Sequence, residues 1–417
     1  MKTIIYLLLT IMMIPIIASS QDKKEEKKYG ISVSGFVKND FFYDTRQTVN
    51  AREGHFLLWP TAKKLDINGV DLNDNASFNF LSIQTRLTGK ITGPDAFGAK
   101  TSGVIEGAFF GHSNADINGF RLRHAFVKLN WENAELLTGQ YWHPLFETSC
   151  FPGVVSFNTG AGIQPFARNP QIRFTYKFGD LQMYAVAYSE RDFTSRGPAG
   201  TNSSYIRNSG MPSEFVGFRY SKKKEDGTGF VAGFGGGTLT IQPQTVTGLG
   251  YKTNQLLRSI NSNVYFRLNT KAVTLKIEGV YGGNMANMLL FGGYAIKDTL
   301  NFTTGEVEWE AINNVAFWLD VHSNGKKIQA GLFAGYNMNM GTSNEVLGGY
   351  QGLANSIKSV MRISPRVIFN SGKFRFATEL EYTMAEYGDN TYDKFAIPQN
   401  TYNVSNLRVL FSTYYFF

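Results

Sequence analysis

The residues best suited to chemistry in this sequence are arginines and lysines that share one parity. Arg121 and Arg123 are two positions apart, and Arg173 and Lys177 are four positions apart. On an extended strand such positions lie on the same face. A guanidinium group binds carboxylate or phosphate through two parallel hydrogen bonds, and an ammonium group attracts the same anions as a point charge. The pattern therefore indicates a surface that handles small anions.

Signals for catalysis or metal binding are absent from the sequence. It contains no G-x-S-x-G elbow, P-loop, H-E-x-x-H or paired-cysteine motif, and Cys150 is the only cysteine. His143 and Glu147 share one segment, but one such pair is too little for a metal site and favours a polar lining role. We expect no catalytic residue, no metal, no cofactor and no enzymatic activity.

Strict alternation of apolar and polar residues shows which elements carry these charges. Phe374, Phe376 and Leu380 alternate with Arg375 and Glu379. A soluble β-sandwich can contain one or two such strands, but it rarely places long charged side chains on nearly every strand. Apart from the amino terminus, no apolar run approaches the roughly 20 residues of a membrane-spanning helix, whereas a barrel strand spans with about 10.

Sixteen segments follow this pattern, and their connections alternate between short turns and long loops. Short Gly/Asn turns such as 179–180 and 370–372 favour tight hairpins. The long loops include 44–78, 142–170 and 191–213. This organisation predicts an all-β fold, an antiparallel transmembrane β-barrel of 16 strands with both termini on the periplasmic side. The expected strands are 31–43, 79–92, 101–111, 119–131, 134–142, 171–178, 181–190, 214–222, 230–241, 259–269, 273–283, 307–322, 327–338, 357–369, 373–386 and 403–417.

The amino terminus has the features of a secretory signal peptide. Lys2 precedes an apolar run that is short for a spanning helix, and small residues follow at 18–20. We expect a signal peptide at 1–20, a short periplasmic tether at 21–29 and the barrel at 30–417. At the other end Phe417 closes a strand with an outward aromatic face and inward Arg408, which resembles the insertion signature of outer-membrane barrels.

The overall composition agrees with a wall that has one apolar and one wet face. The 417 residues are 43% hydrophobic and 14% aromatic but only 18% charged, and the mean hydropathy is still −0.19. A single cysteine excludes a disulfide scaffold. The net charge of +8 is small for this length and forms no basic block, which argues against nucleic-acid binding.

A barrel of this width leaves an aqueous channel, so its inward charges set its selectivity. Strand parity places fifteen basic and six acidic residues inward. We expect Arg362, Arg366, Arg375 and their neighbours on adjacent strands to form one continuous basic wall, although any single arginine could instead pair with an acid. The predicted pore-lining residues are Lys38, Arg86, Arg121, Arg123, Arg168, Arg173, Arg362, Arg366, Arg375 and Arg408.

The third long loop, 142–170, mixes apolar and small residues such as Phe151, Val155 and Phe157. Such a loop is suited to pack against something rather than to extend into water. We expect it to fold inward and narrow the pore; contact with a neighbouring subunit is the alternative. Cys150 is expected as a free thiol on this loop.

Four stretches resemble the DcaP-like porins: SGFVKNDFFYD (34–44), RLRHAFVKL (121–129), LTGQYW (137–142) and RNPQIRFTY (168–176). The resemblance implies a trimeric, sixteen-stranded channel that favours small negatively charged solutes such as dicarboxylates. It carries a pore role to Arg121, Arg123, Arg168 and Arg173. Members of that family can carry a periplasmic coiled coil, for which residues 22–28 are too short.

The sequence thus predicts an outer-membrane porin of a Gram-negative bacterium that gives passive, anion-preferring diffusion of small hydrophilic solutes, with carboxylates as expected cargo. The expected partners are outer-membrane lipid, small anions and two further copies of the chain, without nucleic acid. The alternative is a surface-binding barrel whose long loops capture a ligand, with the first loop and its Trp59 as the candidate surface. The register is ambiguous at 123–131 and 181–190.

Overall fold

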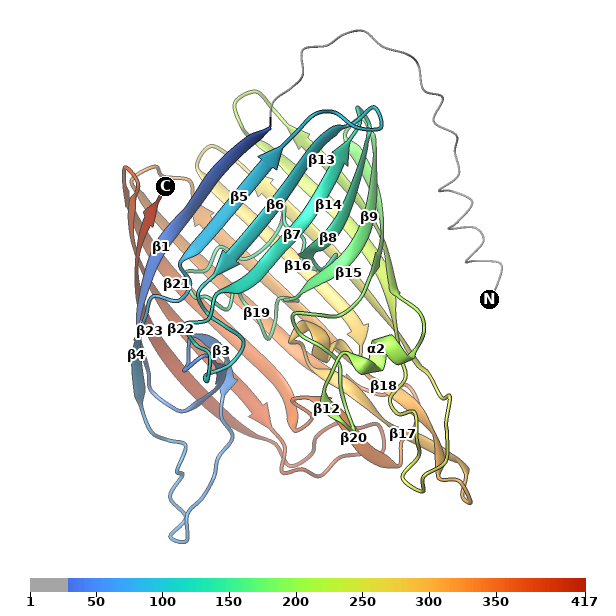
Figure 1. Ribbon diagram of the computed structural model, residues 1–417. Coiled ribbons are helices and arrows are strands. Elements are labelled where there is room, and N and C mark those ends of the chain that lie inside the picture. The colour runs from blue at the N-terminus through green and yellow to red at the C-terminus, as the bar shows by residue number, and fades with distance from the viewer. Residues whose placement is uncertain (1–28) are drawn as a thin grey trace.

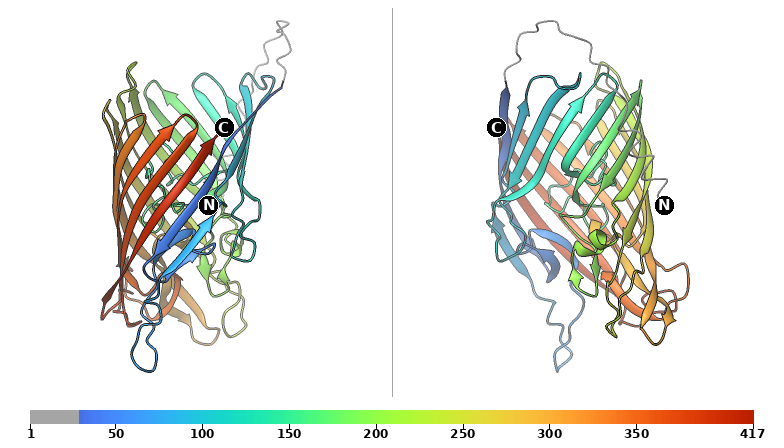
Figure 2. Two further views of the ribbon diagram at one scale, coloured as in Figure 1. Left: turned by 90° about the vertical axis from the view of Figure 1, so that its left-hand side faces the viewer. Right: turned by 45° about the vertical axis from the view of Figure 1, so that its right-hand side comes forward.

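Alternating residues along the chain form strands that close into an antiparallel β-barrel (Figures 1 and 2). The computed structural model describes residues 29–417. The expected signal peptide (1–20) and residues 21–28 of the expected tether lie outside the described residues. The prediction of a 16-stranded all-β barrel is confirmed.

Sixteen spans make up the wall, and one of them is built from two strands, β4 and β5, that both pair with β1. The spans are β1 (Gly30–Asp44), β4 (Ser77–Leu81) with β5 (Arg86–Thr92), β6 (Lys100–Ala108), β7 (Arg121–Asn130), β8 (Ala134–Trp142), β9 (Arg168–Phe178), β10 (Leu181–Tyr188), β13 (Ser213–Lys223), β14 (Gly229–Ile241), β15 (Leu257–Asn269), β16 (Val273–Gly283), β18 (Glu306–Ser323), β19 (Ile328–Gly341), β21 (Ile357–Ser371), β22 (Phe374–Tyr387) and β23 (Tyr402–Phe416).

The remaining elements lie in the long loops. Strands β17 and β20 extend the sheet beyond the wall on β18. No helix of residues 29–417 is long and apolar enough to cross a bilayer. The loop elements are β2 (Thr48–Ala51), β3 (Phe56–Pro60), β11 (Arg196–Gly197), β12 (Gly200–Thr201), α2 (Ser204–Asn208), η1 (Met285–Met288), β17 (Gly292–Asn301) and β20 (Gly348–Leu353).

The first and last strands close the barrel. β1 pairs with β23 from Phe36 opposite Phe416 to Asp44 opposite Arg408. In Figure 1 the short turns and the C-terminus lie at the top, and the long loops lie at the bottom. The arrangement matches that expected for a barrel with short periplasmic turns and long outer loops.

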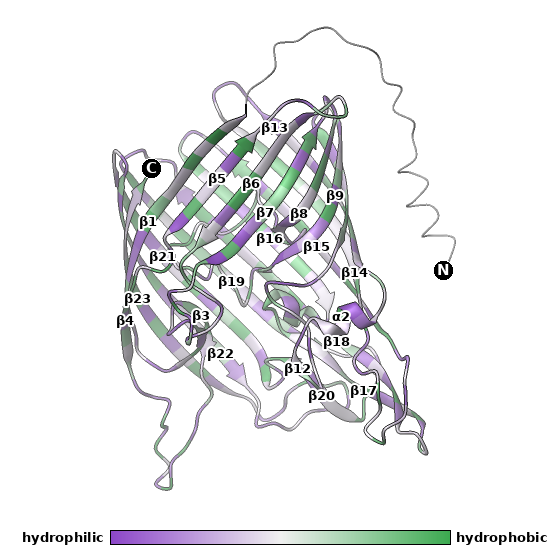
Figure 3. Cartoon of the chain, in the orientation of Figure 1, coloured by the Kyte–Doolittle hydropathy of each residue, from purple (hydrophilic) through white to green (hydrophobic). Residues whose placement is uncertain are grey.

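Parity separates the two faces of the wall. On β23, Tyr415 is 47% and Phe411 is 40% exposed, whereas Arg408 is 1% exposed. Figure 3 shows the same alternation as apolar and polar bands along the strands. The predicted faces of the last strand are therefore correct.

A β-bulge resolves the register that the sequence left ambiguous in β7. The pairing shifts between Glu106 opposite His124 and Gly107 opposite Leu122. A bulge inserts one extra residue into one strand and so exchanges its faces. Arg121 and Arg123 therefore face inward before the bulge, and His124, Phe126 and Lys128 face inward after it, with Val127 59% exposed on the outside. In β10 the even positions are buried, as Tyr184 and Val186 show.

A second irregularity separates β4 from β5. The backbone N–H of Lys38 donates to the Thr85 hydroxyl rather than to a ladder carbonyl. Ile83 is 3% exposed and packs in the largest apolar cluster. The expected unbroken strand over 79–92 is wrong because the chain leaves the sheet at 82–85.

The main apolar cluster is formed largely by outer loops. The first loop (residues 45–76) contributes β3, whose five residues are all buried. The third loop (residues 143–167) contributes Phe146, Phe157 and Phe166, which pack with Val360 and Val404 of the wall. These two valines have the same strand parity as the buried Arg362 and Arg408.

Candidate functional site

Seven of the ten predicted pore-lining residues are buried and paired with a carboxylate; we call them the paired cluster. All seven are at most 4% exposed. Charged groups out of water need such partners, since an uncompensated buried charge costs several kcal/mol. The pairs are Lys38–Asp40, Arg121–Asp192, Arg123–Glu106, Arg168–Asp192, Arg362–Glu381, Arg366–Asp320 and Arg408–Asp44.

Asp192 of the fourth outer loop holds two of these arginines. Its carboxylate pairs with Arg121 and lies 2.8 Å from Arg168 Nη2. Burial alone would raise the pKa of Asp192, but the two guanidinium groups outweigh burial and lower its pKa to about 2. One ionised carboxylate of the fourth loop therefore holds both Arg121 and Arg168.

Arg362 connects two loops to the wall. Its Nη1 donates to the Ala161 carbonyl of the third loop at 2.9 Å, and its Nη2 donates to the Leu58 carbonyl of the first loop. Its Nε lies 3.2 Å from Glu381 Oε1. A guanidinium group can satisfy several acceptors at once, which suits it to fasten backbone segments to a strand.

The backbone of the third loop also bonds to inward carboxylates. Val155 N–H donates to Glu379 at 2.6 Å, and Gly153 N–H donates to Asp320 at 3.1 Å. The Val155 carbonyl accepts a bond from Lys38 Nζ at 3.0 Å. The third loop is thus bound to β1, β18 and β22, none of which is adjacent in the wall to β8 or β9, the strands that carry the loop.

The expectation of a continuous basic wall is wrong, because acidic residues lie among the basic ones. Arg362, Arg366 and Arg408 lie on neighbouring strands as predicted, but Asp320 and Glu381 and their neighbours alternate with them. The wall is a mixed network in which each buried cation has an acidic partner.

A second group of cations, the unpaired cluster, lies nearer the strand ends that the short turns connect. Within residues 29–417, no carboxylate lies within salt-bridge distance of these side chains, which are half-buried or exposed. Their hydrogen bonds go to neutral acceptors: Arg267 to Ser149 O at 3.1 Å and Lys276 to Phe151 O at 3.0 Å. The group comprises Arg173, Lys177, Arg267, Lys276 and Arg375.

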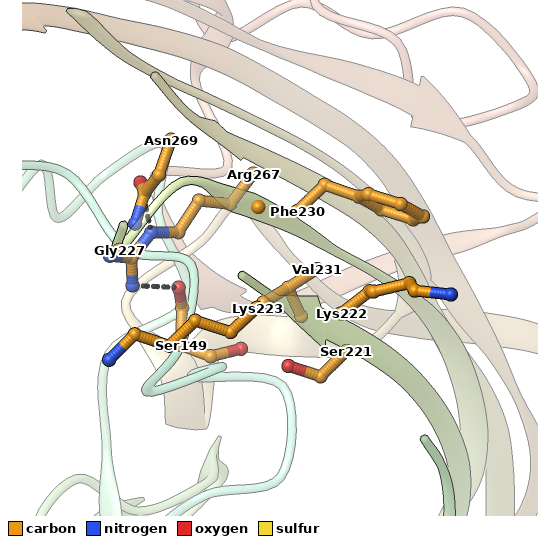
Figure 4. A pocket seen from close by; sticks show the side chains of 10 residues that line it. Ser149, Ser221, Lys222, Lys223, Gly227, Phe230, Val231, Arg267 and Asn269 are labelled. Atoms are coloured by element: carbon orange, nitrogen blue, oxygen red, sulfur yellow. Dashed lines mark hydrogen bonds between the residues drawn. The ribbon is translucent and has the colours of Figure 1, made fainter. Parts of the chain in front are cut away.

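The unpaired cluster lines cavities next to the third loop. Figure 4 shows one of about 430 Å³, in which Arg267 donates to the Ser149 carbonyl and to Asn269. Another, of about 200 Å³, is lined by Lys276 and Arg375. Arg86, the tenth predicted residue, is intermediate: its side chain is 24% exposed and lies 3.7 Å from Glu106. Whether each of the ten lines the conducting path stays a prediction.

Strand parity missed partners that the structure brings to the charged lumen. Asp44 continues the parity of Lys38 and Asp40 and could have been found from β1 alone. Lys128, which pairs with Glu135 at 3.0 Å, was hidden by the bulge. Asp192 lies in a loop, where no periodicity predicts a direction.

Two further residues singled out by the sequence are buried. Trp59 is 2% exposed and packs against Phe291, so it is not part of the first-loop surface considered for the alternative of ligand capture. Cys150 is a free, buried thiol, and burial raises its pKa to about 12. Among residues 29–417, no group of three His, Cys, Asp or Glu side chains is arranged to hold a metal ion.

Solved structures of outer-membrane channels share this architecture. The outer membrane channel DcaP of Acinetobacter baumannii aligns over 96% of this chain and 100% of its own, with 17% identity and a TM-score of 0.68. An anion-selective porin from Comamonas acidovorans aligns over 94% and 100%, with 12% identity and a TM-score of 0.53. The trimer form of OmpT from Vibrio cholerae aligns over 94% and 100%, with 10% identity and a TM-score of 0.54.

Neither a protein-family model nor a curated protein sequence matches this chain. At these identities the structural likeness establishes the fold. The resemblance to DcaP-like porins that the four sequence stretches indicated is confirmed at that level, and the chain has the fold of a Gram-negative outer-membrane channel.

Proposed function

We propose that this chain is an outer-membrane porin that gives passive, anion-preferring diffusion of small hydrophilic solutes, with small carboxylates as preferred cargo. A sixteen-stranded barrel with a wet inner face suits a channel, and exposed apolar residues such as Phe411 and Tyr415 suit contact with lipid. No cofactor or catalytic group is needed for diffusion.

The unpaired cluster is the observation that carries the anion preference. A cation beside a carboxylate presents little net charge to a passing ion, whereas Arg267, Lys276 and Arg375 each bond only to neutral acceptors. Charges inside a low-dielectric wall act over longer distances than charges on an open surface. The field along this part of the lumen should therefore favour anions.

The third loop is the proposed constriction. Its bonds to Lys38, Asp320 and Glu379 support this role, because these residues lie on β1, β18 and β22, far around the wall from the strands that carry the loop. A loop held across the inner side of a barrel reduces the free cross-section and keeps solutes near its polar edge.

The structural neighbours support the proposal by analogy. The Comamonas acidovorans protein is described as an anion-selective porin, and OmpT of Vibrio cholerae has a trimer form. We propose that this chain also prefers anions and forms a homotrimer through its barrel wall.

Reversal potentials in planar bilayers under a KCl gradient test the proposal. We expect a sign that reports chloride permeating faster than potassium. A potential of the opposite sign would overturn the anion preference. Liposome swelling with succinate tests permeation itself, and impermeable liposomes would overturn the porin function.

One feature favours the alternative of a surface-binding barrel. The tip of the first loop, which extends past the rim at the lower left of Figure 1, carries Leu65, Ile67 and Val70 at 61%, 99% and 61% exposure. Exposed apolar tips of this kind suit contact with another macromolecule. Impermeable liposomes would favour this reading, whereas swelling in a variant lacking residues 64–72 would show that the tip is not needed for transport.

A further inference from the structure

Arg258 is an arginine of the wall that faces away from the lumen. It lies at the start of β15 and is exposed. It shares the strand parity of Ile260 and Val264, which are 65% and 62% exposed, whereas Ser259 and Asn261 on the other face are buried. Arg258 therefore lies on the lipid-facing surface of the barrel, at one end of a column of apolar side chains.

The Arg258 guanidinium group has no partner in the described chain. Within residues 29–417 its side chain makes no hydrogen bond, ion pair or ring contact. An acid on the same face, Glu214 of β13, pairs through β14 with the row of Ile260 and so lies two strands from it, which is about 10 Å. The N–H donors of the guanidinium group are thus available to a molecule outside the chain.

The position of Arg258 along β15 places it at the edge of the apolar band. Ile260, Val264, Phe266 and Leu268 form the lipid-facing column of this strand. Leu268 and Arg258 are ten residues apart in β15. At about 3.3 Å per residue and a strand tilt of about 40°, they are about 25 Å apart along the barrel axis, which equals the height of the apolar band of such barrels. Arg258 therefore lies at the depth of lipid headgroups.

The strand end that carries Arg258 belongs to a long loop, residues 242–256, which joins β14 to β15. Outer-membrane barrels carry their long loops on the extracellular side, and this orientation places Arg258 in the outer leaflet. The outer leaflet of a Gram-negative outer membrane is built mainly from a glycolipid whose sugars carry phosphate groups. A guanidinium group binds phosphate through two parallel hydrogen bonds, so charge complementarity favours this lipid as the partner.

The wall beside Arg258 offers an apolar surface to the acyl chains of such a lipid. Phe234 of β14 and Gly279 of β16 lie opposite Val264, one on each side of it. Phe234 is 59% and Tyr281 is 46% exposed. Because Gly279 has no side chain, the surface is recessed between Val264 and Tyr281. An acyl chain can lie along this surface while the phosphate group reaches Arg258.

We propose that Arg258 and the lipid-facing surface of β14, β15 and β16 bind the phosphorylated glycolipid of the outer leaflet, with a phosphate group on the guanidinium group and an acyl chain beside Val264. The site lies on the opposite face of the wall from the lumen, so it does not depend on which ions or solutes pass through the barrel. A bound lipid would hold this part of the wall at a fixed depth in the membrane.

Native mass spectrometry of the full chain in detergent, with diphosphoryl lipid A as the added lipid, tests the site. We expect the wild type to bind diphosphoryl lipid A more tightly than a dephosphorylated lipid with the same acyl chains. R258Q should raise the dissociation constant of diphosphoryl lipid A by about fivefold. R258K keeps the charge but loses the planar fork, and its dissociation constant should lie between the two. Heat-modifiable migration on gels shows that each variant is folded.

K222Q is the matched control, because Lys222 is an exposed cation with lipid-facing parity at the other end of the neighbouring strand β13. It should change the dissociation constant by less than about twofold. An unchanged dissociation constant in R258Q, an equal effect of K222Q, or equal binding of the phosphorylated and dephosphorylated lipids would overturn the site. Displacement of the lipid by an equal concentration of inorganic phosphate would overturn it too, since that result describes a site for free anions.

Reversal potentials separate this site from the proposed function. The potential of R258Q under a KCl gradient should equal that of the wild type, because Arg258 faces away from the lumen. A shifted potential in R258Q would place this side chain in the lumen and overturn the lipid site. Cation preference in the wild type would overturn the proposed function and leave the lipid site standing.

Discussion

Arg362 and Arg375 lie on the adjacent strands β21 and β22, yet their surroundings differ completely. Arg362 is 1% exposed and bonds to Glu381 and to two loop carbonyls. Arg375 is half-buried and donates to Asn370, with no carboxylate within salt-bridge distance in the part of the chain that the structure describes. Arg362 represents the paired cluster, and Arg375 represents the unpaired cluster.

The difference separates two uses of the same residue type. In the paired cluster, carboxylates neutralise the cations and loop carbonyls accept their hydrogen bonds, so these cations stabilise the folded structure. In the unpaired cluster, no carboxylate neutralises the cations, so their charge acts on the ions that pass. The third loop contacts both clusters, because Lys38 and Arg362 of the first and Arg267 and Lys276 of the second all donate hydrogen bonds to its backbone.

The largest expected effect concerns Cys150, which lies in the third loop between Ser149 and Phe151, whose carbonyls accept bonds from Arg267 and Lys276. Burial raises the pKa of its thiol from 9.0 to about 12, so the thiol stays protonated between pH 7 and 9. We expect maleimide labelling of the folded protein at pH 8 to be about a thousandfold slower than labelling of a free cysteine. The denatured chain, which has this one cysteine, is the control. Labelling of the folded protein at the denatured rate would mean that Cys150 is not buried and that the third loop is not packed against the two clusters.

The next effect concerns the stability of the paired cluster. D192N leaves Arg121 and Arg168 buried without their carboxylate and should lower the free energy of unfolding by about 3 kcal/mol. Denaturant unfolding in detergent measures it. D74N is the control, because Asp74 is 74% exposed and 3.7 Å from Arg46, and it should change stability by less than about 0.5 kcal/mol.

The pH dependence of the same pair has a defined sign. The pKa of Asp192 is lowered from 3.8 to about 2, so its contribution is fully present above the unfolded value and is lost as the pH falls through about 2. The stability difference between wild type and D192N should therefore persist at pH 4. A difference that vanishes by pH 4 would contradict an ionised, arginine-bound Asp192.

A smaller effect is expected from neutralising the unpaired cluster. R267Q/K276Q/R375Q removes three charges that have no carboxylate within salt-bridge distance among residues 29–417. It should lower the chloride-to-potassium permeability ratio by roughly fivefold, or about 1 kcal/mol. Reversal potentials measure it. An unchanged ratio would place ion selection elsewhere in the lumen.

The smallest effect is expected from deleting a whole pair. R366Q/D320N removes one cation and its partner at 2.9 Å, so the net charge is unchanged. The reversal potential should equal that of the wild type within error. A loss of anion preference as large as that of the triple variant would erase the distinction between the clusters.

Much of the wall follows from local pattern. The strand expected at 134–142 coincides with β8, and parity places Arg408 inside and Tyr415 outside. Each of these predictions depends on neighbours one or two residues away, because successive side chains of a strand point to opposite faces. The bulge in β7 and the break before β5 were not predicted. An inserted residue shows itself only in the pairing with the neighbouring strand, which the sequence of one strand does not contain.

The sequence by itself determined the barrel, the number of its strands and the face on which most charges lie, because periodicity is a local property. Only the tertiary structure decided which of those charges are neutralised. Asp192 is 71 residues from Arg121, and Asp44 is 364 residues from Arg408. Ion pairing depends on separations of a few ångströms and on exclusion of water, and both arise only when loops and distant strands are brought together.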